Sequence, residues 1–413
     1  MFRRRSANAG RRGMTGPAFG YLLGGYLLAG LLLAVLAAPA EAGDRWVGTW
    51  GASPSDPLLT ADKPSPSYKD QTVRLVAHVS IGGSRIRLRL SNGLGRAPLI
   101  VGAVHVCQSG QDAPDHVVTF AGQGRFAIPK GADNLSDPVD LAVPSGADVT
   151  VSLYFPADTG PITQHSLGVQ TGYVAPGDQT AAVNLAIASP ILARPVLSGI
   201  EVQGQAGDAA VVTLGDSITD GQHSTVDADR RWPDLLAARL ETRYGGHVGV
   251  VNAGIDGNRL LSESKFGPNA LARFDRDVLA QAGARYLTVL LGINDIGHAP
   301  DTPVDVSQII AALRQLADRA HDHGLKIYGA TLLPFEDSPY WATEGETMRQ
   351  AVNRWIRESG AFDAVLDFDQ VMRDPARPVH LAPGYDSGDH LHPNDAGYAA
   401  MAASIDLGLF KPH

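Results

Sequence analysis

The stretch that decides the fold is Val211-Val212-Thr213-Leu214-Gly215-Asp216-Ser217-Ile218-Thr219-Asp220. Its apolar, β-branched start predicts a buried strand that ends abruptly at Gly215. A serine at the carboxyl end of a buried strand, after a glycine that permits a sharp turn, lies at the sheet edge where open α/β folds bind ligands. Serine is a weak nucleophile at neutral pH, so a reactive Ser217 requires a base and an anion-stabilising site elsewhere in the chain.

Strand and helix patterns alternate on both sides of this stretch. Five apolar runs that predict strands are each followed by a run that predicts an amphipathic helix. The predicted pairs are 210–214 with 232–244, 248–252 with 271–282, 286–291 with 306–323, 326–331 with 345–359, and 364–367 with 396–407. This order predicts an α/β domain over residues 201–413, with a parallel sheet covered by helices on both faces.

The preceding region, residues 43–200, has the pattern of an all-β domain. Arg85-Ile86-Arg87-Leu88-Arg89-Leu90 alternates strictly between polar and apolar residues, as in a strand with one wet face. Further strands are predicted at 72–79 and 149–155, separated by turns rich in glycine and proline. No helical pattern is evident, and we expect a β-sandwich of jelly-roll type.

The first 42 residues have the pattern of a secretory signal peptide. Five arginines precede an apolar run over residues 18–38, and Ala40-Glu41-Ala42 provides an A-x-A cleavage site. We expect cleavage near Ala42 and a secreted or periplasmic protein. The apolar run is also long enough for an uncleaved membrane anchor, which is the alternative.

Charge and cysteine content restrict the partners and the chemistry. The 413 residues carry a formal net charge of −9, and loss of five arginines and one glutamate with the first 42 residues would make it −13. An acidic surface disfavours nucleic acid and anionic membranes, so neither is expected as a partner unless the amino-terminal segment stays in a membrane. Cys107 is the only cysteine, which excludes an intramolecular disulfide and a cysteine-based zinc site.

Polar or glycine residues follow three predicted strands, and a histidine-rich segment lies near the carboxyl terminus. The four segments are Gly215-Asp216-Ser217, Asn252-Ala253-Gly254, Gly292-Ile293-Asn294-Asp295 and Asp389-His390-Leu391-His392-Pro393. Because the carboxyl ends of parallel strands meet at one sheet edge, we expect these segments to converge on one crevice.

The requirements of ester cleavage assign a role to each segment. Ser217 would attack the carbonyl, His392 would accept and return the proton, and Asp389 would orient the imidazole and stabilise its cation. The backbone N–H groups of Ser217 and Gly254 and the side-chain amide of Asn294 would stabilise the oxyanion. These roles require neither a metal nor an organic cofactor.

In this order the four segments resemble the SGNH hydrolases, also called GDSL esterases and lipases. The residues that give the family its name fall on Ser217, Gly254, Asn294 and His392, and the family's aspartate falls on Asp389. The resemblance covers about residues 208–409. It implies a flavodoxin-like α/β hydrolase fold and a carboxylic ester as substrate.

The amino-terminal part, with Trp46-Val47-Gly48-Thr49-Trp50-Gly51-Ala52-Ser53-Pro54, resembles secreted members of this family that carry a β-sandwich before the hydrolase domain. Several of those act on acetylated plant polysaccharides, and others are lysophospholipase-like. We therefore expect a secreted serine esterase that removes O-acetyl groups from carbohydrate. The alternative within the same class is a lysophospholipase or short-chain lipase, and the alternative of another class is a non-catalytic polysaccharide-binding protein.

Competing interpretations exist for several of these positions. Ser217 alone also fits a helix N-cap. His390 competes with His392 for the role of base, and Asp386 competes with Asp389. The cluster of residues 389, 390, 392 and 395 has the side chains of a metal site.

Some polar residues near the motifs are assigned no chemistry. Asp216 is read as an orienting residue, and Asp295 as a structural residue that holds its loop through backbone N–H groups. His223 and His298 are read as surface residues.

Overall fold

The computed structural model describes residues 45–56, 58–60, 63–64, 66–110, 115–299 and 301–412. The predicted signal peptide lies outside these residues. Asp44–His413 forms one compact unit. Within the described ranges, no helix is both long enough and apolar enough to cross a bilayer.

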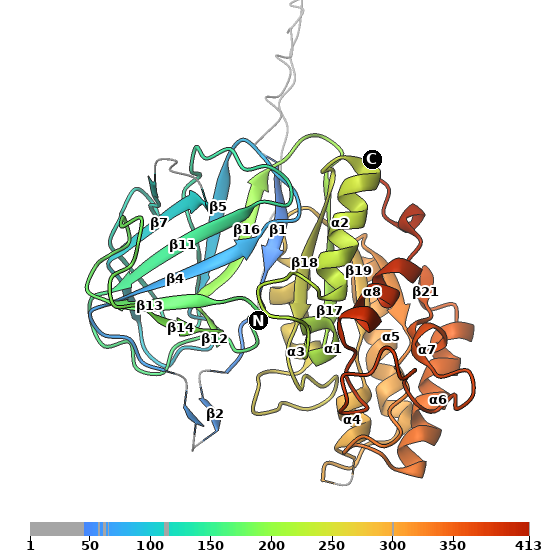
Figure 1. Ribbon diagram of the computed structural model, residues 1–413. Helices are drawn as coiled ribbons and strands as arrows, with labels where there is room; N and C mark the ends of the chain where they lie inside the picture. Colours follow the sequence, from blue (N-terminus) through green and yellow to red (C-terminus); the bar gives the residue numbers. More distant parts are fainter. Residues whose placement is uncertain are drawn as a thin grey trace, which may run out of the picture. The chain divides into compact units, whose positions relative to one another are not determined.

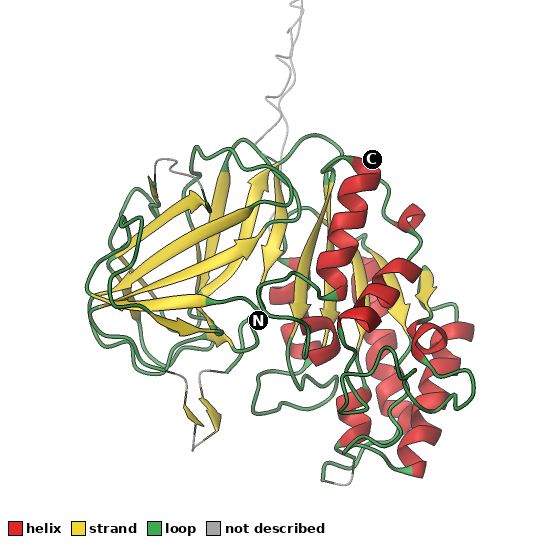
Figure 2. Ribbon diagram, in the orientation of Figure 1, coloured by secondary structure: helices red, strands yellow, loops and turns green. Residues whose placement is uncertain are grey.

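The first part of the described chain consists of antiparallel sheets, which confirms the predicted all-β region (Figures 1 and 2). A four-stranded sheet has the order β1-β16-β5-β10, and a six-stranded sheet has the order β14-β13-β4-β11-β7-β8. Their strands are β1 (Trp46–Gly51), β4 (Gln71–His78), β5 (Ile86–Ser91), β7 (Ala103–Gln108), β8 (His116–Val117), β10 (Asp133–Leu135), β11 (Asp148–Phe155), β13 (Gly172–Pro176), β14 (Ser189–Ile191) and β16 (Leu197–Gln203). Two-stranded pairs add β2 (Leu58–Thr60) with β3 (Lys63–Pro64), β6 (Leu99–Val101) with β9 (Phe126–Ile128), and β12 (Gln164–His165) with β15 (Arg194–Pro195). Jelly-roll connectivity stays a prediction.

The alternating pattern of β5 explains why this segment forms a strand. Ile86, Leu88 and Leu90 are fully buried, and the two arginines between them are partly exposed. One face of the strand therefore contributes to the core, as the sequence predicts.

A five-stranded parallel sheet follows, in the order β18-β17-β19-β20-β21. Its strands are β17 (Ala209–Gly215), β18 (Val248–Gly254), β19 (Ala284–Leu290), β20 (Lys326–Ala330) and β21 (Ala364–Leu366). Every residue of β17 and β18 is buried, as expected for strands covered on both faces. The predicted flavodoxin-like α/β fold is confirmed.

Helices cover this sheet in two groups (Figure 1). Contacts join α2 and α7 to α8, and they join α3, α4, α5 and α6 in a second group. The helices are α1 (Ser217–Asp220), α2 (Trp232–Tyr244), α3 (Ala270–Phe274), α4 (Ile293–Gly297), α5 (Val306–Asp322), α6 (Thr343–Glu358), α7 (Phe368–Met372) and α8 (Asp395–Ser404). A π-helical turn, η1 (Asp275–Leu279), continues α3, and the 3₁₀ turn η2 (Leu407–Leu409) follows α8.

Local signals fix the ends of the longer helices. Asp305 and Gln308 form a capping box at the start of α5, which satisfies backbone N–H groups that the helix itself leaves unpaired. Gly245 ends α2 in the left-handed conformation, with φ of 63°. These ends agree with the helices predicted from the sequence.

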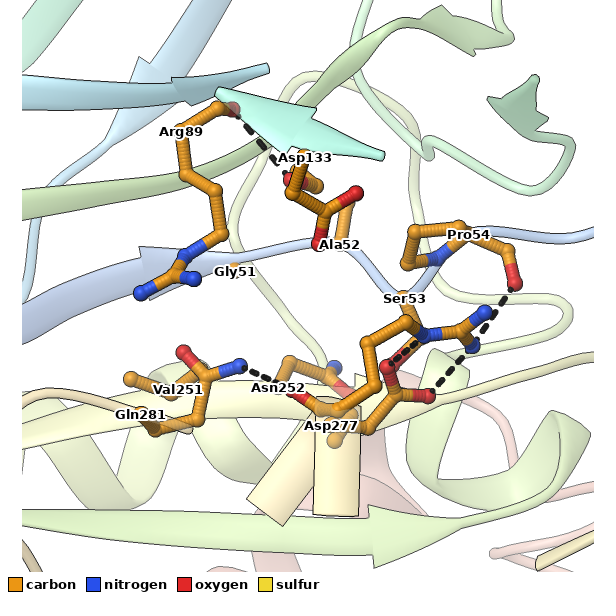
Figure 3. A pocket seen from close by; sticks show the side chains of 13 residues that line it. Gly51, Ala52, Ser53, Pro54, Arg89, Asp133, Val251, Asn252, Asp277 and Gln281 are labelled. Atoms are coloured by element: carbon orange, nitrogen blue, oxygen red, sulfur yellow. Dashed lines mark hydrogen bonds and ion pairs between the residues drawn. The ribbon is translucent and has the colours of Figure 1, made fainter. Parts of the chain in front are cut away.

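The β-rich part and the parallel sheet share packing. Ala210 and Val251, from two strands of the parallel sheet, belong to the hydrophobic core of the β-rich part. The Gly48 N–H donates to the Ala282 carbonyl at 2.8 Å. Figure 3 shows a pocket at this contact, lined on one side by Gly51, Ala52, Ser53 and Pro54 and on the other by Val251, Asn252 and Asp277. The predicted division near residue 200 therefore separates two types of sheet that are closely packed.

Candidate active site

Ser217 lies two residues after the end of β17, at the carboxyl edge of the parallel sheet. Asp216 caps α1 by accepting the Ile218 N–H at 3.1 Å, an orienting role that agrees with its interpretation from the sequence. A Cβ on Gly215 would lie 2.1 Å from the hydroxyl oxygen of Thr219, so only glycine fits this sharp turn. The backbone N–H of Ser217 has no acceptor in the described part of the chain.

Ser217, His392 and Asp389 form a continuous series of hydrogen bonds. Ser217 Oγ lies 2.8 Å from His392 Nε2, and His392 Nδ1 lies 2.6 Å from Asp389 Oδ2. An ionised carboxylate only accepts hydrogen bonds, so Nδ1 donates to Asp389 and Nε2 is left to accept the serine proton. The structure thus brings together three residues that are far apart in the sequence.

The carboxylate of Asp389 is held by several donors. Its Oδ1 accepts the N–H groups of Leu391 at 3.0 Å and His392 at 2.9 Å, and the hydroxyl of Ser387 at 3.0 Å. Burial raises the pKa of Asp389, but the hydrogen bonds and charge of His392 outweigh it and hold this pKa well below its ordinary value. Asp389 is therefore ionised at neutral pH, as a partner for an imidazolium must be.

The competing residues have other partners. His390 Nδ1 lies 2.6 Å from Asp386 Oδ2, and the His390 side chain is 46% exposed. Asp395 accepts the N–H and the hydroxyl of Thr225 at 2.9 and 2.6 Å. The metal cluster considered from the sequence is therefore divided among separate hydrogen-bonded pairs.

The side chain of Asn294, near the start of α4, is fixed at both of its polar atoms. Nδ2 donates to the Asn258 carbonyl at 3.1 Å, and Oδ1 accepts the Tyr340 hydroxyl at 3.0 Å. His298 Nε2 lies 3.2 Å from that hydroxyl and donates to it, because the tyrosine proton is used on Asn294. Burial and the charge of Arg259 lower the pKa of His298, which keeps its ring neutral. Among the described residues, the second Nδ2 hydrogen of Asn294 has no acceptor.

Asp295 has the structural role that the sequence predicts. Its two oxygens accept the N–H groups of Leu260 at 2.8 Å and Leu261 at 3.1 Å. Burial raises the pKa of Asp295, and these two hydrogen bonds oppose the rise. The residue ties α4 to the loop that follows β18.

Gly254 does not have the role predicted for it. Its N–H donates to the side-chain oxygen of Asn252 at 2.8 Å, so this N–H is already used. A Cβ on Gly254 would lie 2.4 Å from the backbone nitrogen of Asp220. Glycine is required here because β18 packs directly against the backbone of α1.

Gly257, three residues further along, offers the N–H that Gly254 lacks. No acceptor for its N–H exists within the described ranges, and its φ of 64° favours glycine. The next residue, Asn258, supplies the carbonyl that holds Asn294. Gly257, rather than Gly254, is therefore our candidate for the second backbone donor.

Asp216 is a buried carboxyl group beside this site. Burial raises its pKa to about 7, although the Ile218 N–H and the charge of His392 oppose the rise. Within the described ranges, its Oδ2 has no hydrogen-bond partner. Asp216 is thus a buried carboxyl group with one unpaired oxygen and a pKa close to neutral pH.

Residues 213–400, which contain all of these groups, match the GDSL-like Lipase/Acylhydrolase family. The chain therefore contains a domain of this family over residues 213–400. It is a carboxylic ester hydrolase, and the predicted family and enzyme class are confirmed. Among curated proteins, none matches the sequence.

Solved structures similar to this GDSL-like hydrolase cover about half of the chain. A putative lipolytic protein of G-D-S-L family from Desulfitobacterium hafniense DCB-2 is 21% identical and covers 48% of this chain and 97% of its own, with a TM-score of 0.38. An acetylxylan esterase from Geobacillus stearothermophilus is 22% identical and covers 50% of this chain and 96% of its own, with a TM-score of 0.38. An α/β hydrolase enzyme from the metagenome of Lake Arreo has the same identity, coverage and TM-score as the acetylxylan esterase.

A second histidine of the hydrolase shares the carboxylate of Asp389. His223 Nε2 lies 3.1 Å from Asp389 Oδ2, and the centroids of the His223 and His392 rings are 5.5 Å apart. The His223 side chain is 43% exposed, in agreement with its assignment to the surface. Its contact with Asp389 was not predicted, because 166 positions separate the two residues.

Two groups of described residues have side-chain atoms close enough to hold a metal ion. One is His223, Asp389 and His392, and the other is His78, Asp148 and Asp229. In both groups the histidines already have carboxylate partners. The first group shares Asp389 and His392 with the hydrogen-bonded series of Ser217, His392 and Asp389. A metal bound there would compete with the serine proton for His392.

Proposed function

We propose that this ester hydrolase acts through an acyl-enzyme on Ser217 and that its preferred substrates are O-acetyl groups on carbohydrate. One observation carries the proposal: Ser217 Oγ lies 2.8 Å from His392 Nε2, whose other nitrogen lies 2.6 Å from Asp389. This is the arrangement that general-base activation of a serine requires.

The reaction proceeds in two displacements. Ser217 Oγ bonds to the ester carbonyl carbon as its proton passes to His392 Nε2, and the carbonyl oxygen becomes an oxyanion. The tetrahedral species then expels the alcohol, which takes the proton back from His392. Water, activated by the same imidazole, releases the acid and restores Ser217.

Three donors are suited to the oxyanion. The N–H groups of Ser217 and Gly257 have no acceptor among the described residues, and Asn294 Nδ2 has one hydrogen that is not donated to Asn258. Donors placed in advance stabilise the charge that develops in the transition state without reorganising.

The substrate preference is supported by the polar surroundings of the site. Burial and the charge of Asp220 raise the pKa of Asp256, and the charges of His392, His165 and Lys265 oppose the rise, so several ionisable groups influence this carboxyl group. Tyr340 and His298 add hydrogen-bonding groups beside Asn294. A hydroxyl-rich leaving group suits such groups, whereas a long acyl chain needs apolar walls.

Export is also part of the proposal. It is supported by the arginine-rich start, the apolar run and Ala40-Glu41-Ala42. Amino-terminal sequencing of the protein recovered from the culture medium or periplasm tests it. A first residue just after Ala42 is expected, and an intact segment in the membrane fraction would establish the anchor instead.

A substrate screen with an active-site variant tests the catalytic proposal. Wild type, Ser217→Ala and the exposed control Ser404→Ala are assayed on p-nitrophenyl acetate, octanoate and palmitate, on acetylated xylan and on a lysophospholipid. We expect acetate release by wild type and Ser404→Ala, and a loss of about 10⁴-fold or more in Ser217→Ala. Preference for the octanoate, palmitate or lysophospholipid would establish a lipase instead. Activity in a correctly folded Ser217→Ala would overturn the mechanism.

A further inference from the structure

A buried histidine of the β-rich part contacts the helix that carries Ser217. His165 ends β12, on the side of the β-rich part that faces α1 (Figure 1). Its Nε2 lies 2.9 Å from Asp220 Oδ1, and the two side chains are 5% and 2% exposed. Asp220 is the last residue of α1, three positions after Ser217.

Both ring nitrogens of His165 face atoms that accept hydrogen bonds. Nδ1 lies 3.0 Å from the Ser53 carbonyl, and Nε2 lies 3.0 Å from the Leu167 carbonyl as well as close to Asp220. A neutral imidazole has one N–H and would set its other lone pair against an acceptor. The imidazolium satisfies both sides, so the geometry requires a protonated ring.

The electrostatics agree with this geometry. Burial lowers the pKa of His165. The charge and hydrogen bond of Asp220 and the hydrogen bonds to the two carbonyls outweigh this effect of burial, so the pKa of His165 is raised overall. Other charged groups that act on the pair from neighbouring elements are Asp256, Arg231 and Arg273. The result is an ion pair enclosed between the two parts of the molecule.

Asp220 connects this pair to the loop with the free N–H. Its Oδ2 accepts the backbone N–H of Asp256 at 2.9 Å, and Gly257 is the next residue. One carboxylate therefore joins the histidine of the β-rich part to the oxyanion loop, which we define as residues 256–258. Removing the charge of His165 would leave Asp220 buried with only its second oxygen paired.

Arg273, a side chain with no exposed surface, supports the same arrangement. It donates to Ser53 Oγ at 3.3 Å, and the Ser53 carbonyl holds His165. It also donates to the Gly215 and Ala253 carbonyls and to Asn258 Oδ1, at 2.8 to 3.0 Å. The segment that follows β1 is thus tied both to His165 and to the carboxyl edge of the parallel sheet.

We propose that His165 is a positioning residue of the esterase: as an imidazolium it fixes Asp220, and through Asp220 it sets the oxyanion loop so that the Gly257 N–H meets the developing oxyanion. The β-rich part thereby takes part in catalysis without touching the substrate. This inference rests on the proposed function, because it assigns Gly257 to the oxyanion.

Kinetics of charge-removing variants test the role. The whole protein is compared with His165→Gln, Asp220→Asn and the double variant on p-nitrophenyl acetate. Each single variant is expected to lose about 10- to 100-fold in kcat, with KM within about twofold of wild type, because a displaced donor affects mainly the transition state. The double variant is expected to lose less than the product of the single losses, because both residues act through one contact.

A second histidine–aspartate pair provides the matched control. His247 Nδ1 lies 2.7 Å from Asp208 Oδ1, beside the amino ends of β17 and β18 and therefore at the opposite edge of the sheet. His247→Gln is expected to keep wild-type kcat and KM. A folded His165→Gln with wild-type kcat, or with a raised KM alone, overturns the proposal.

Nitrogen NMR of the wild-type protein keeps the test independent of folding of the variants. With ¹⁵N-labelled histidine, His165 is expected to show protons on both ring nitrogens at about pH 8, where a free imidazole is neutral. A single protonated nitrogen overturns the inference. A wild type that hydrolyses no ester overturns the proposed function, whereas an active wild type with unaffected variants overturns only the role of His165.

Discussion

One histidine–aspartate pair contacts α1 at Ser217 and another includes Asp220 at the end of α1, and the two pairs differ in the group that the second histidine nitrogen faces. In the pair of His392 and Asp389, that nitrogen faces a hydroxyl, which can give up its proton. In the pair of His165 and Asp220, the corresponding nitrogen faces a backbone carbonyl, which can only accept. The same two side chains therefore move a proton in one place and hold a fixed charge in the other.

Burial strengthens this difference. The His165 and Asp220 side chains are almost completely buried, whereas Asp389 is 32% exposed and also contacts His223. A buried ion pair adds little net stability, because desolvation offsets its attraction, but breaking it leaves an uncompensated charge. The buried pair is thus suited to fixing geometry, and the outer pair to repeated proton transfer.

Removing His392 should have the largest effect. His392→Ala is expected to lower kcat on p-nitrophenyl acetate by about 10⁴-fold or more, because Ser217 loses its base. His165→Gln, with its expected loss of about 10- to 100-fold, is the comparison variant. Equal losses in the two folded variants would contradict the distinction between moving and holding a proton.

Removing the side-chain donor of the oxyanion site should have the next largest effect. Asn294→Ala is expected to lower kcat by about 10²- to 10³-fold, as for other oxyanion donors. Tyr340→Phe retains the amide of Asn294 but loses the hydroxyl that orients it. It is expected to lower kcat by about tenfold, which corresponds to the free energy of roughly one hydrogen bond. If Tyr340→Phe were as damaging as Asn294→Ala, the amide would not itself be the donor.

Asp216 is a buried carboxyl group without a hydrogen bond to a histidine, and its raised pKa predicts a pH-dependent stability. Its pKa is raised to about 7, so the folded state favours the protonated form and loses stability as pH rises from the unfolded pKa toward 7. Asp216→Asn should therefore gain stability relative to wild type between about pH 4.5 and 8, by roughly 1–4 kcal/mol.

Urea unfolding at several pH values measures this difference. Asp305→Asn is the control. Hydrogen bonds from Ser307 lower the pKa of this exposed N-cap residue, so the contribution of Asp305 to the free energy of unfolding should rise with pH, opposite to that of Asp216. A difference between Asp216→Asn and wild type that does not change with pH would contradict the raised pKa.

The contact of His223 with Asp389 should have the smallest effect. Exposed ion pairs contribute up to about 1 kcal/mol, so His223→Ala is expected to change kcat/KM by less than about fivefold. The measurement is kcat/KM on p-nitrophenyl acetate near neutral pH. A larger loss would mean that Asp389 needs both His223 and His392 to function. The pair of His392 and Asp389 would then be part of a cluster of three residues.

Much of the candidate site could be predicted because its signals are local. Ser217, Asn294, Asp389 and His392 each lie in a short motif at a strand end or in the last loop. Parallel strands place their carboxyl ends at one edge, so the order of the motifs was enough to predict their convergence. The five strands could also be predicted from the sequence, because strands buried on both faces are continuous apolar runs.

The second backbone donor shows where this reasoning fails. Gly254 ends β18 and Gly257 lies three residues after it, and a motif does not tell which of the two N–H groups stays free. Hydrogen bonding to Asn252 and packing against Asp220 decide that Gly254 is occupied. The direction of an N–H depends on the conformation of the turn, which these tertiary contacts fix.

The sequence by itself therefore determined the two types of sheet, the hydrolase family and the residues of the series from Ser217 to Asp389, because periodicity and motif spacing are properties of neighbouring residues. Only the tertiary structure decided which glycine offers its N–H and that His165 contacts Asp220 at the end of α1. His165 is 55 positions from Asp220 and lies in a segment without a motif. Its charge follows from the three acceptors around it, and folding alone brings those acceptors together.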